Sequence, residues 1–187
     1  MRCADLHLRA AVAADAAAIA RIHTESWQLD YRDILKHAYL DDEAPAERLA
    51  LWLSRMGGDA PPRVLLAESA DGVVLGFVCV FPDVDSRFGA LLDNLHVAPA
   101  ARGRGIGRRL LAEACRELRT YGQSGGMHLW VYAANRSASG FFRRYGGSEV
   151  TRETIVTPDG GTTISLCYHW PNLDMLAADT GARDSGK

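Results

Sequence analysis

One junction constrains the fold of this chain more than any other stretch, because a strand-like apolar run meets a helix-like one through alternate glycines. It reads HVAPAARGRGIGRRLL and spans residues 96–111. The glycines at 103, 105 and 107 let a ligand approach the backbone closely. The first turn of the following helix offers unpaired N–H groups and the positive end of the helix dipole. The junction therefore predicts a site for anionic oxygen atoms, and for phosphate above all.

The spacing of these glycines excludes two common nucleotide-binding motifs. A P-loop requires G-x-x-x-x-G-K-[ST], and no lysine follows the glycines. A dinucleotide fingerprint requires G-x-G-x-x-G, and Arg108 stands where its last glycine belongs. The next strand-like run, MHLWVYAAN, also lacks the acidic end that would hold a ribose. What remains is the spacing R-x-x-G-x-G, from Arg102 to Gly107.

The composition is that of an ordinary globular protein. The chain has 187 residues, of which 48% are hydrophobic and 24% are charged, and its formal net charge is -2. Such a balance gives no overall attraction to nucleic acid or to an anionic membrane. We expect one domain over residues 1–170 and a flexible C-terminal tail over residues 171–187, where small and polar residues predominate.

Nothing in the sequence predicts export, a membrane span or a metal site. Charged residues interrupt the alanine-rich N-terminus, and no apolar run approaches the length of a membrane helix. The cysteines are widely scattered, at positions 3, 79, 115 and 167, and have neither C-x-x-C spacing nor a histidine at zinc-ligand spacing. We therefore expect reduced thiols in a cytoplasmic protein.

Hydrophobic periodicity predicts an α/β chain with the element order βααβββαβαββ. The dipeptide Asp71-Gly72 predicts a hairpin turn, and residues 158–161 predict another. The helices are expected at residues 14–27, 44–56, 106–118 and 137–147, and the strands at 6–11, 63–70, 73–83, 90–99, 127–135, 148–157 and 162–170.

Two segments of the sequence resemble one known family. LLDNLHVAPAARGRGIGRRLL, residues 91–111, is similar to the pyrophosphate-binding segment of the GNAT superfamily of acyl-CoA-dependent N-acyltransferases. LWVYAANRSASGFFRRYGG, residues 129–147, resembles the strand and helix that follow it there. The resemblance covers Leu6 to about Trp170 and is specific in the central half. It implies a mixed, mostly antiparallel sheet of six to seven strands flanked by about four helices.

The resemblance also implies an activity. The expected reaction transfers an acetyl group from acetyl-CoA, by direct attack, to a primary amine of a small molecule or to a protein N-terminus. The alternative is a non-catalytic acyl-CoA-binding regulatory protein of the same fold. A weaker alternative is nucleic-acid binding by a stripe of arginines, although no DNA-binding module supports it. That stripe consists of Arg102, Arg104, Arg108, Arg109, Arg116 and Arg119.

By resemblance, the backbone from Gly103 to Arg108 cradles the pyrophosphate, with arginines as charged neighbours. The family splays its fourth and fifth strands apart. The main chain around Leu95 and Val97 is therefore expected to hydrogen-bond the pantetheine arm of the cofactor in the place of a missing strand. Asn135 either contacts that arm or serves as a turn residue that ends its strand. The expected cofactor-binding residues are Leu95, Val97, Arg102, Gly103, Arg104, Gly105, Ile106, Gly107, Arg108, Asn135 and Phe142.

Acyl transfer to an amine requires a base, because an alkylammonium with a pKa of about 10.4 is almost wholly protonated at neutral pH. Asp93 is the only carboxylate on the strand that precedes the glycine turn, and alternation places it on the face of Leu91 and Leu95. We predict that Asp93 is the base, with a salt-bridged or solvent-facing role as the alternative. His96 alternates to the other face, where we expect it to pack or to form a hydrogen bond.

The family commonly uses a tyrosine to protonate the departing CoA thiolate, and Phe142 occupies that position in this sequence. A thiol with a pKa of about 8.5 leaves tolerably well as the thiolate, so the phenol is not essential. Tyr145 lies one helical turn on and is a candidate for supplying the hydroxyl, with core packing as the alternative.

The acceptor amine is expected against the first helix and the loop after it. Glu25, Trp27 and Tyr31 combine a carboxylate with aromatic rings, a pattern that suits a cationic amine, although aromatic residues at this spacing also form cores. We expect a small-molecule amine as the partner, and neither nucleic acid nor a membrane. A homodimer is among the assemblies left open.

Overall fold

The computed structural model describes residues 6–59, 61–120 and 125–174. Within them, seven strands and four α-helices confirm the predicted order and fold class. The elements are β1 (Leu6–Ala10), α1 (Ala16–Asp30), α2 (Ala44–Gly57), β2 (Arg63–Ser69), β3 (Val74–Asp85), β4 (Gly89–Val97), α3 (Ile106–Thr120), β5 (Met127–Tyr132), α4 (Arg136–Arg144), β6 (Ser148–Val156) and β7 (Thr162–Trp170).

The strands follow the order β1-β2-β3-β4-β5-β7-β6. β4 and β5 pair in parallel, whereas β1 with β2, β5 with β7 and β6 with β7 pair antiparallel. The sheet is therefore mixed and mostly antiparallel, as predicted. No helix of the described residues has both the length and the apolar character needed to cross a membrane.

Contacts within the chain divide it into two compact units. One consists of residues 1–79 and 94–110, and the other of residues 80–93 and 111–187. A single domain over residues 1–170 stays a prediction. The predicted tail lies outside the described residues from position 175 onward.

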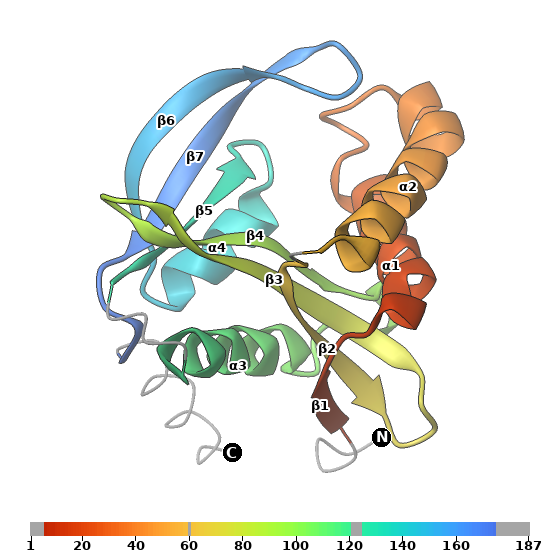
Figure 1. Ribbon diagram of the computed structural model, residues 1–187. Helices are drawn as coiled ribbons and strands as arrows, with labels where there is room; N and C mark the ends of the chain where they lie inside the picture. Colours follow the sequence, from red (N-terminus) through yellow and green to blue (C-terminus); the bar gives the residue numbers. More distant parts are fainter. Residues whose placement is uncertain (1–5, 60, 121–124, 175–187) are drawn as a thin grey trace. The chain divides into compact units, whose positions relative to one another are not determined.

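In the first unit, helices α1 and α2 lie side by side (Figure 1). Strand β1 pairs with β2, and a tight turn leads into β3, where Gly72 takes a φ of 78° and its N–H donates to the carbonyl of Ser69 at 2.9 Å. This is the hairpin turn that Asp71-Gly72 predicts. The apolar residues at helical and strand spacing form the core, whose fully buried members include Ile19, Ile22, Trp52, Leu66 and Phe77.

In the second unit, β6 and β7 form a long antiparallel hairpin (Figure 1). β7 also pairs with β5 along the whole of β5. β5 ends at Tyr132, earlier than the sequence predicts, because Asn135 leaves the strand and accepts a hydrogen bond from the Ala138 N–H at 3.0 Å. This bond caps α4. The largest fully buried side chains of this unit are Leu111, Leu118, Met127, Tyr168 and Trp170.

Gly76 provides a test of the packing around β3 and β4. A β-carbon at this position would lie 2.8 Å from the carbonyl oxygen of His96 and 3.2 Å from Cδ1 of Leu110. We predict that Gly76→Ala lowers the free energy of unfolding by about 1–3 kcal/mol, because backbone and core must shift to admit the methyl group. Urea unfolding measures this change.

Gly140 supplies the matched control. It is exposed inside α4, and a β-carbon there would meet nothing within 4 Å. Gly140→Ala should raise the free energy of unfolding by up to about 1 kcal/mol, because alanine favours the helix. Equal stability of Gly76→Ala and wild type would contradict the described approach of the two strands.

Candidate functional site

The glycine turn between β4 and α3 has the geometry that the sequence predicts. Gly103 and Gly105 take φ values of 76° and 77°, in the left-handed region that favours glycine. A β-carbon at either position would meet no protein atom within 4 Å. Helix α3 begins at Ile106, and the Arg109 N–H donates to the Gly105 carbonyl at 3.1 Å. The N–H groups of the first turn therefore lie beside an open stretch of backbone.

Arg102 is held by protein groups at the start of this turn. Its two terminal nitrogens donate to the carboxylate of Asp30 at 2.7 and 2.8 Å, and its Nε donates to the carbonyl of Val97 at 3.2 Å. The side chain thus joins the last residue of α1 to the last residue of β4. Arg102 therefore positions the turn, and its contact with the cofactor stays a prediction. Sequence reasoning missed Asp30, because the pair is separated by 72 positions and no motif signals it.

The hydrogen bonds near the two ends of β4 go to different neighbours. The Ala98 N–H donates to the Leu75 carbonyl of β3 at 2.8 Å, whereas the Ala90 N–H donates to the Gly126 carbonyl, just before β5, at 3.0 Å. In a regular strand positions 90 and 98 would direct their N–H groups to the same edge, so the alternation is interrupted between them. The direction of the Leu95 and Val97 main chain toward a ligand therefore stays a prediction. In the described residues, the parallel register of β4 and β5 consists of two pairs, Ala90 with Met127 and Leu91 with His128.

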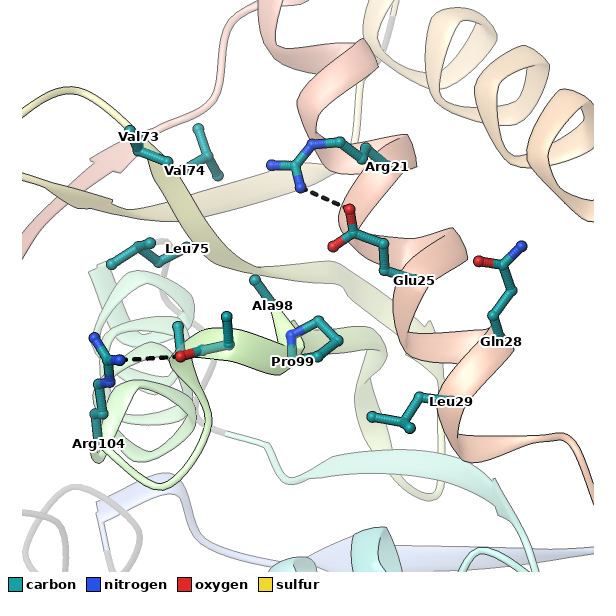
Figure 2. Close-up of a pocket in the computed structure, with 12 residues that line it drawn as sticks. Arg21, Glu25, Gln28, Leu29, Val73, Val74, Leu75, Ala98, Pro99 and Arg104 are labelled. Atoms are coloured by element: carbon teal, nitrogen blue, oxygen red, sulfur yellow. Dashed lines mark hydrogen bonds and ion pairs between the residues drawn. The ribbon is translucent and has the colours of Figure 1, made fainter.

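A groove of about 760 Å³ adjoins the turn (Figure 2). Arg104 lies on one side, where it donates to the Ala100 carbonyl at 3.0 Å, and Glu25 of α1 lies on the other, paired with Arg21 at 2.8 Å. The groove therefore brings together Arg104, a predicted cofactor residue, and Glu25, a predicted acceptor residue. The remaining lining residues are Gln28, Leu29, Val73, Val74, Leu75, Ala98, Pro99 and Ala101.

A buried aromatic cluster connects α1 to β4. The rings of His23 and His96 stack with their centres 4.6 Å apart, and Phe77 lies 5.4 Å from His96. Trp52 of α2 donates its indole N–H to Nδ1 of His23 at 3.0 Å. The expectation that His96 packs is confirmed, whereas the face on which it lies relative to Asp93 stays a prediction. His96 is half-buried and contributes its ring to the contact between α1 and β4.

Burial controls the charge of both histidines. Desolvation lowers the pKa of His96 to about 4, with Asp30 opposing that shift and Arg102 adding to it. Desolvation also lowers the pKa of His23 well below 6.5, and the neighbouring His96, Arg48 and Arg55 act in the same direction. Both rings are therefore neutral at physiological pH.

Trp27 lies at the same end of α1 and is only 9% exposed. Its ring packs edge-on against His23, with ring centres 5.0 Å apart, and lies tilted against Tyr31, with ring centres 5.4 Å apart. The guanidinium of Arg48 stacks on it, with the Arg48 Cζ 4.5 Å from the ring centre. One face of Trp27 thus already holds a protein cation, and the acceptor role of Trp27 and Tyr31 stays a prediction.

The remaining candidates belong to the second unit. Asp93 is exposed between the buried Leu92 and Asn94, as strand alternation requires. Phe142 is buried and packs against Trp170, with ring centres 6.0 Å apart.

Tyr145 lies next to this aromatic group, on the turn that ends α4. It is partly buried against Phe141, with ring centres 4.8 Å apart, and its carbonyl accepts the indole N–H of Trp170 at 2.8 Å. Asn135 uses its side-chain oxygen to cap α4. The catalytic roles of Asp93 and Tyr145, and the cofactor contacts of Asn135 and Phe142, stay predictions.

Comparison with known proteins identifies a family and relatives that match large parts of the chain. Residues 17–147 match the acetyltransferase (GNAT) family. The chain is 28% identical over 171 residues to the uncharacterized N-acetyltransferase YuaI of Bacillus subtilis, which covers 90% of this chain and 95% of YuaI. It is 36% identical over 93 residues to the streptothricin acetyltransferase of Streptomyces lavendulae, 48% of this chain and 47% of that enzyme.

A solved structure shares the fold. The PaiA N-acetyltransferase of Thermoplasma acidophilum, in complex with coenzyme A, superposes with a TM-score of 0.68 at 20% identity. The match covers 89% of this chain and 98% of that one.

The stacked histidines predict how stability depends on pH. In the unfolded chain an imidazole binds its proton near pH 6.5, whereas folded His96 does so near pH 4. Stability should therefore fall as pH falls from about 6.5 to about 4, because the unfolded chain binds more protons. We predict that His96→Leu makes this decline shallower by about 1.4 kcal/mol per pH unit, the value for one proton.

Urea unfolding of both proteins at several pH values in this window measures the slopes. The titrating carboxylates are common to the two proteins, so the difference between the curves isolates the imidazole. Parallel curves would show that His96 titrates normally in the folded chain.

Proposed function

Because the chain belongs to the GNAT family of acetyltransferases, we propose that it transfers the acetyl group of acetyl-CoA directly to the primary amine of a small molecule. Acetyl transfer, with acetyl-CoA as the cosubstrate, follows from the family. The small-molecule acceptor is supported by the streptothricin acetyltransferase among the relatives, whose name gives such a substrate.

The observation that carries the proposal is the open glycine turn. Gly103 and Gly105 leave the backbone uncovered at the start of α3, where unpaired N–H groups favour an anion. We infer that the N–H groups from Gly103 to Arg108 bind the pyrophosphate of acetyl-CoA. The short parallel register of β4 and β5 supports binding of the pantetheine arm by the main chain of Leu95 and Val97.

The chemistry requires a proton acceptor and a leaving thiolate. In our proposal Asp93, directly or through a water molecule, removes the proton from the ammonium group, and the neutral nitrogen then forms a bond to the acetyl carbonyl carbon. The carbon–sulfur bond breaks, the electron pair leaves with sulfur, and the nitrogen loses its second proton to solvent. Buried Phe142 has no proton to donate, so Tyr145 or water protonates the thiolate.

Glu25 is the proposed contact for the acceptor amine. It lines the groove beside Arg104, and its ion pair with Arg21 joins two side chains that are 38% and 51% exposed. An exposed ion pair contributes little free energy, so a cationic amine can replace Arg21 at small cost. Trp27 and Tyr31, from the same end of α1, supply aromatic surface.

Gly105→Val tests the phosphate assignment. We predict that the variant loses acetyl-CoA binding, because the new side chain occupies the space through which the phosphates approach the backbone. Isothermal titration with acetyl-CoA measures the loss. Gly160→Val is the control, because Gly160 has a matching φ of 79° and open surroundings but lies in the β6–β7 turn.

Both variants carry the same left-handed strain, of about 1–2 kcal/mol. The control should therefore lose a similar amount of stability and keep its affinity for acetyl-CoA. An unchanged affinity in folded Gly105→Val would remove the turn from the binding site.

Asp93→Asn tests the base. We predict that kcat falls by about 10²-fold or more while acetyl-CoA affinity barely changes, because the variant cannot accept the amine proton. The rise of rate with pH that we expect in wild type should disappear as well. Steady-state kinetics across pH measure both effects, once an amine panel has supplied a substrate.

Two other outcomes assign Asp93 differently. An increase in the amine KM with kcat near the wild-type value would make Asp93 an anchor for a cationic substrate. No kinetic change would place its side chain outside the reaction.

A further inference from the structure

Trp130 of β5 is an exposed indole in a strand whose other residues are buried or half-buried. Its residue is 37% exposed, whereas both of its neighbours along the strand are buried. The other tryptophans are in different surroundings, because arginines of α2 stack on Trp27 and Trp52, and Trp170 is buried. In the described residues no ring and no cation stacks on Trp130. One large aromatic surface therefore faces solvent from the middle of the sheet.

The register of β4 and β5 places Trp130 and Asp93 on one face of the sheet. The last registered pair is Leu91 with His128, and paired residues direct their side chains to the same face. Burial alternates regularly over residues 89–95, so we place the interruption of β4 beyond Asp93. Asp93 lies two residues after Leu91, and Trp130 lies two residues after His128, so alternation keeps them on that face.

Both side chains are therefore accessible where β4 and β5 cease to pair. Asp93 and Trp130 are exposed, and the parallel register of the described residues ends before them. The pantetheine arm is proposed to enter between these two strands. An acceptor that meets the acetyl group there encounters a carboxylate on one strand and an indole on the other.

The electrostatics of this part of the sheet favour a cation. Cys167 of β7 lies directly opposite Trp130 and is buried. Burial raises the pKa of the Cys167 thiol to about 11, and the carboxylates of Asp85 and Glu153 add to that rise, while Arg87 opposes them. Two carboxylates thus act here against one guanidinium. Such surroundings disfavour another negative charge and favour a positive one.

We propose that Trp130 holds the ammonium group of the acceptor against its ring, beside Asp93, and that the acceptor binds as the cation. This inference rests on the role proposed for Asp93 and not on the contact proposed for Glu25. The face of an aromatic ring attracts an ammonium group, and tryptophan attracts it most strongly. Trp130 thereby selects an alkylammonium over a neutral compound of the same shape, and it presents the proton to the base.

Trp130→Leu tests the contact by kinetics. We expect kcat/KM for the best amine of a panel to fall by about 3- to 30-fold, the range that corresponds to a cation–π contact. The loss should lie mainly in the amine KM, because the contact holds the cation before chemistry begins. Trp130→Phe should recover part of the loss, since a smaller aromatic face remains.

Ile164→Ala is the matched control. Ile164 of β7 is 46% exposed and lies three residues from Cys167, the partner of Trp130, so its side chain leaves the opposite face. The control also removes exposed apolar surface from the sheet, and it should keep the wild-type kcat/KM. Equal values in wild type, Trp130→Leu and Ile164→Ala would overturn the inference.

A binding measurement separates this inference from the proposed function. Choline is compared with the neutral alcohol in which a carbon atom replaces its nitrogen, because the two have nearly the same shape. In the ¹⁵N-labelled protein, the indole N–H signal that Trp130→Phe lacks belongs to Trp130. Choline should shift this signal more strongly than the alcohol does. Asp93→Asn should weaken the response to choline and leave the response to the alcohol unchanged.

The two failures have different signatures. If choline shifts the Trp130 signal selectively while no amine is acetylated, the cation site is confirmed and the proposed function is wrong. If amines are acetylated equally fast by wild type and Trp130→Leu, and the signal responds equally to choline and to the alcohol, this inference alone is wrong.

Discussion

The contact between Arg102 and Asp30 sets the geometry on which the candidate site depends. Bonds of 2.7 and 2.8 Å join the guanidinium to the end of α1, and a third joins it to the last carbonyl of β4. The glycine turn begins at the next residue, so its two left-handed glycines start from a fixed point. An arginine that a motif would assign to phosphate thus positions the backbone that we propose binds the phosphate.

One unit of the chain holds the glycine turn and the predicted acceptor residues, whereas Asn135 and Phe142 belong to the other unit. The stacked rings of His23 and His96 join α1 to β4, and the ion pair of Arg102 with Asp30 joins α1 to the turn. Residues on α1 and in the turn consequently meet along one groove. The unit also brings a buried arginine, Arg48, against the aromatic end of α1. Packing within this one unit therefore holds the glycine turn close to the predicted acceptor residues of α1.

Local sequence patterns predicted the helices and strands, but they did not predict contacts between side chains that are far apart in the sequence. Apolar spacing indicates the helices and strands, because burial of one face repeats along the sequence. Glycines at 103 and 105 are recognised because few other residues adopt a positive φ. Asn135 illustrates the limit, since its capping bond to Ala138 shortened a strand that looked longer in the sequence. Two contacts have no repeating spacing in the sequence and are found only in the folded chain. They are the ion pair of Asp30 with Arg102 and the stacking of Arg48 on Trp27.

The central claim is that the chain moves an acetyl group from acetyl-CoA to an amine. Its most direct test incubates the full chain with acetyl-CoA and a broad amine panel, and measures thiol release together with the mass of each amine. The account predicts one N-acetylated product for each CoA thiol released. Binding of acetyl-CoA without any acetylated amine, or thiol release without a matching product, would contradict it.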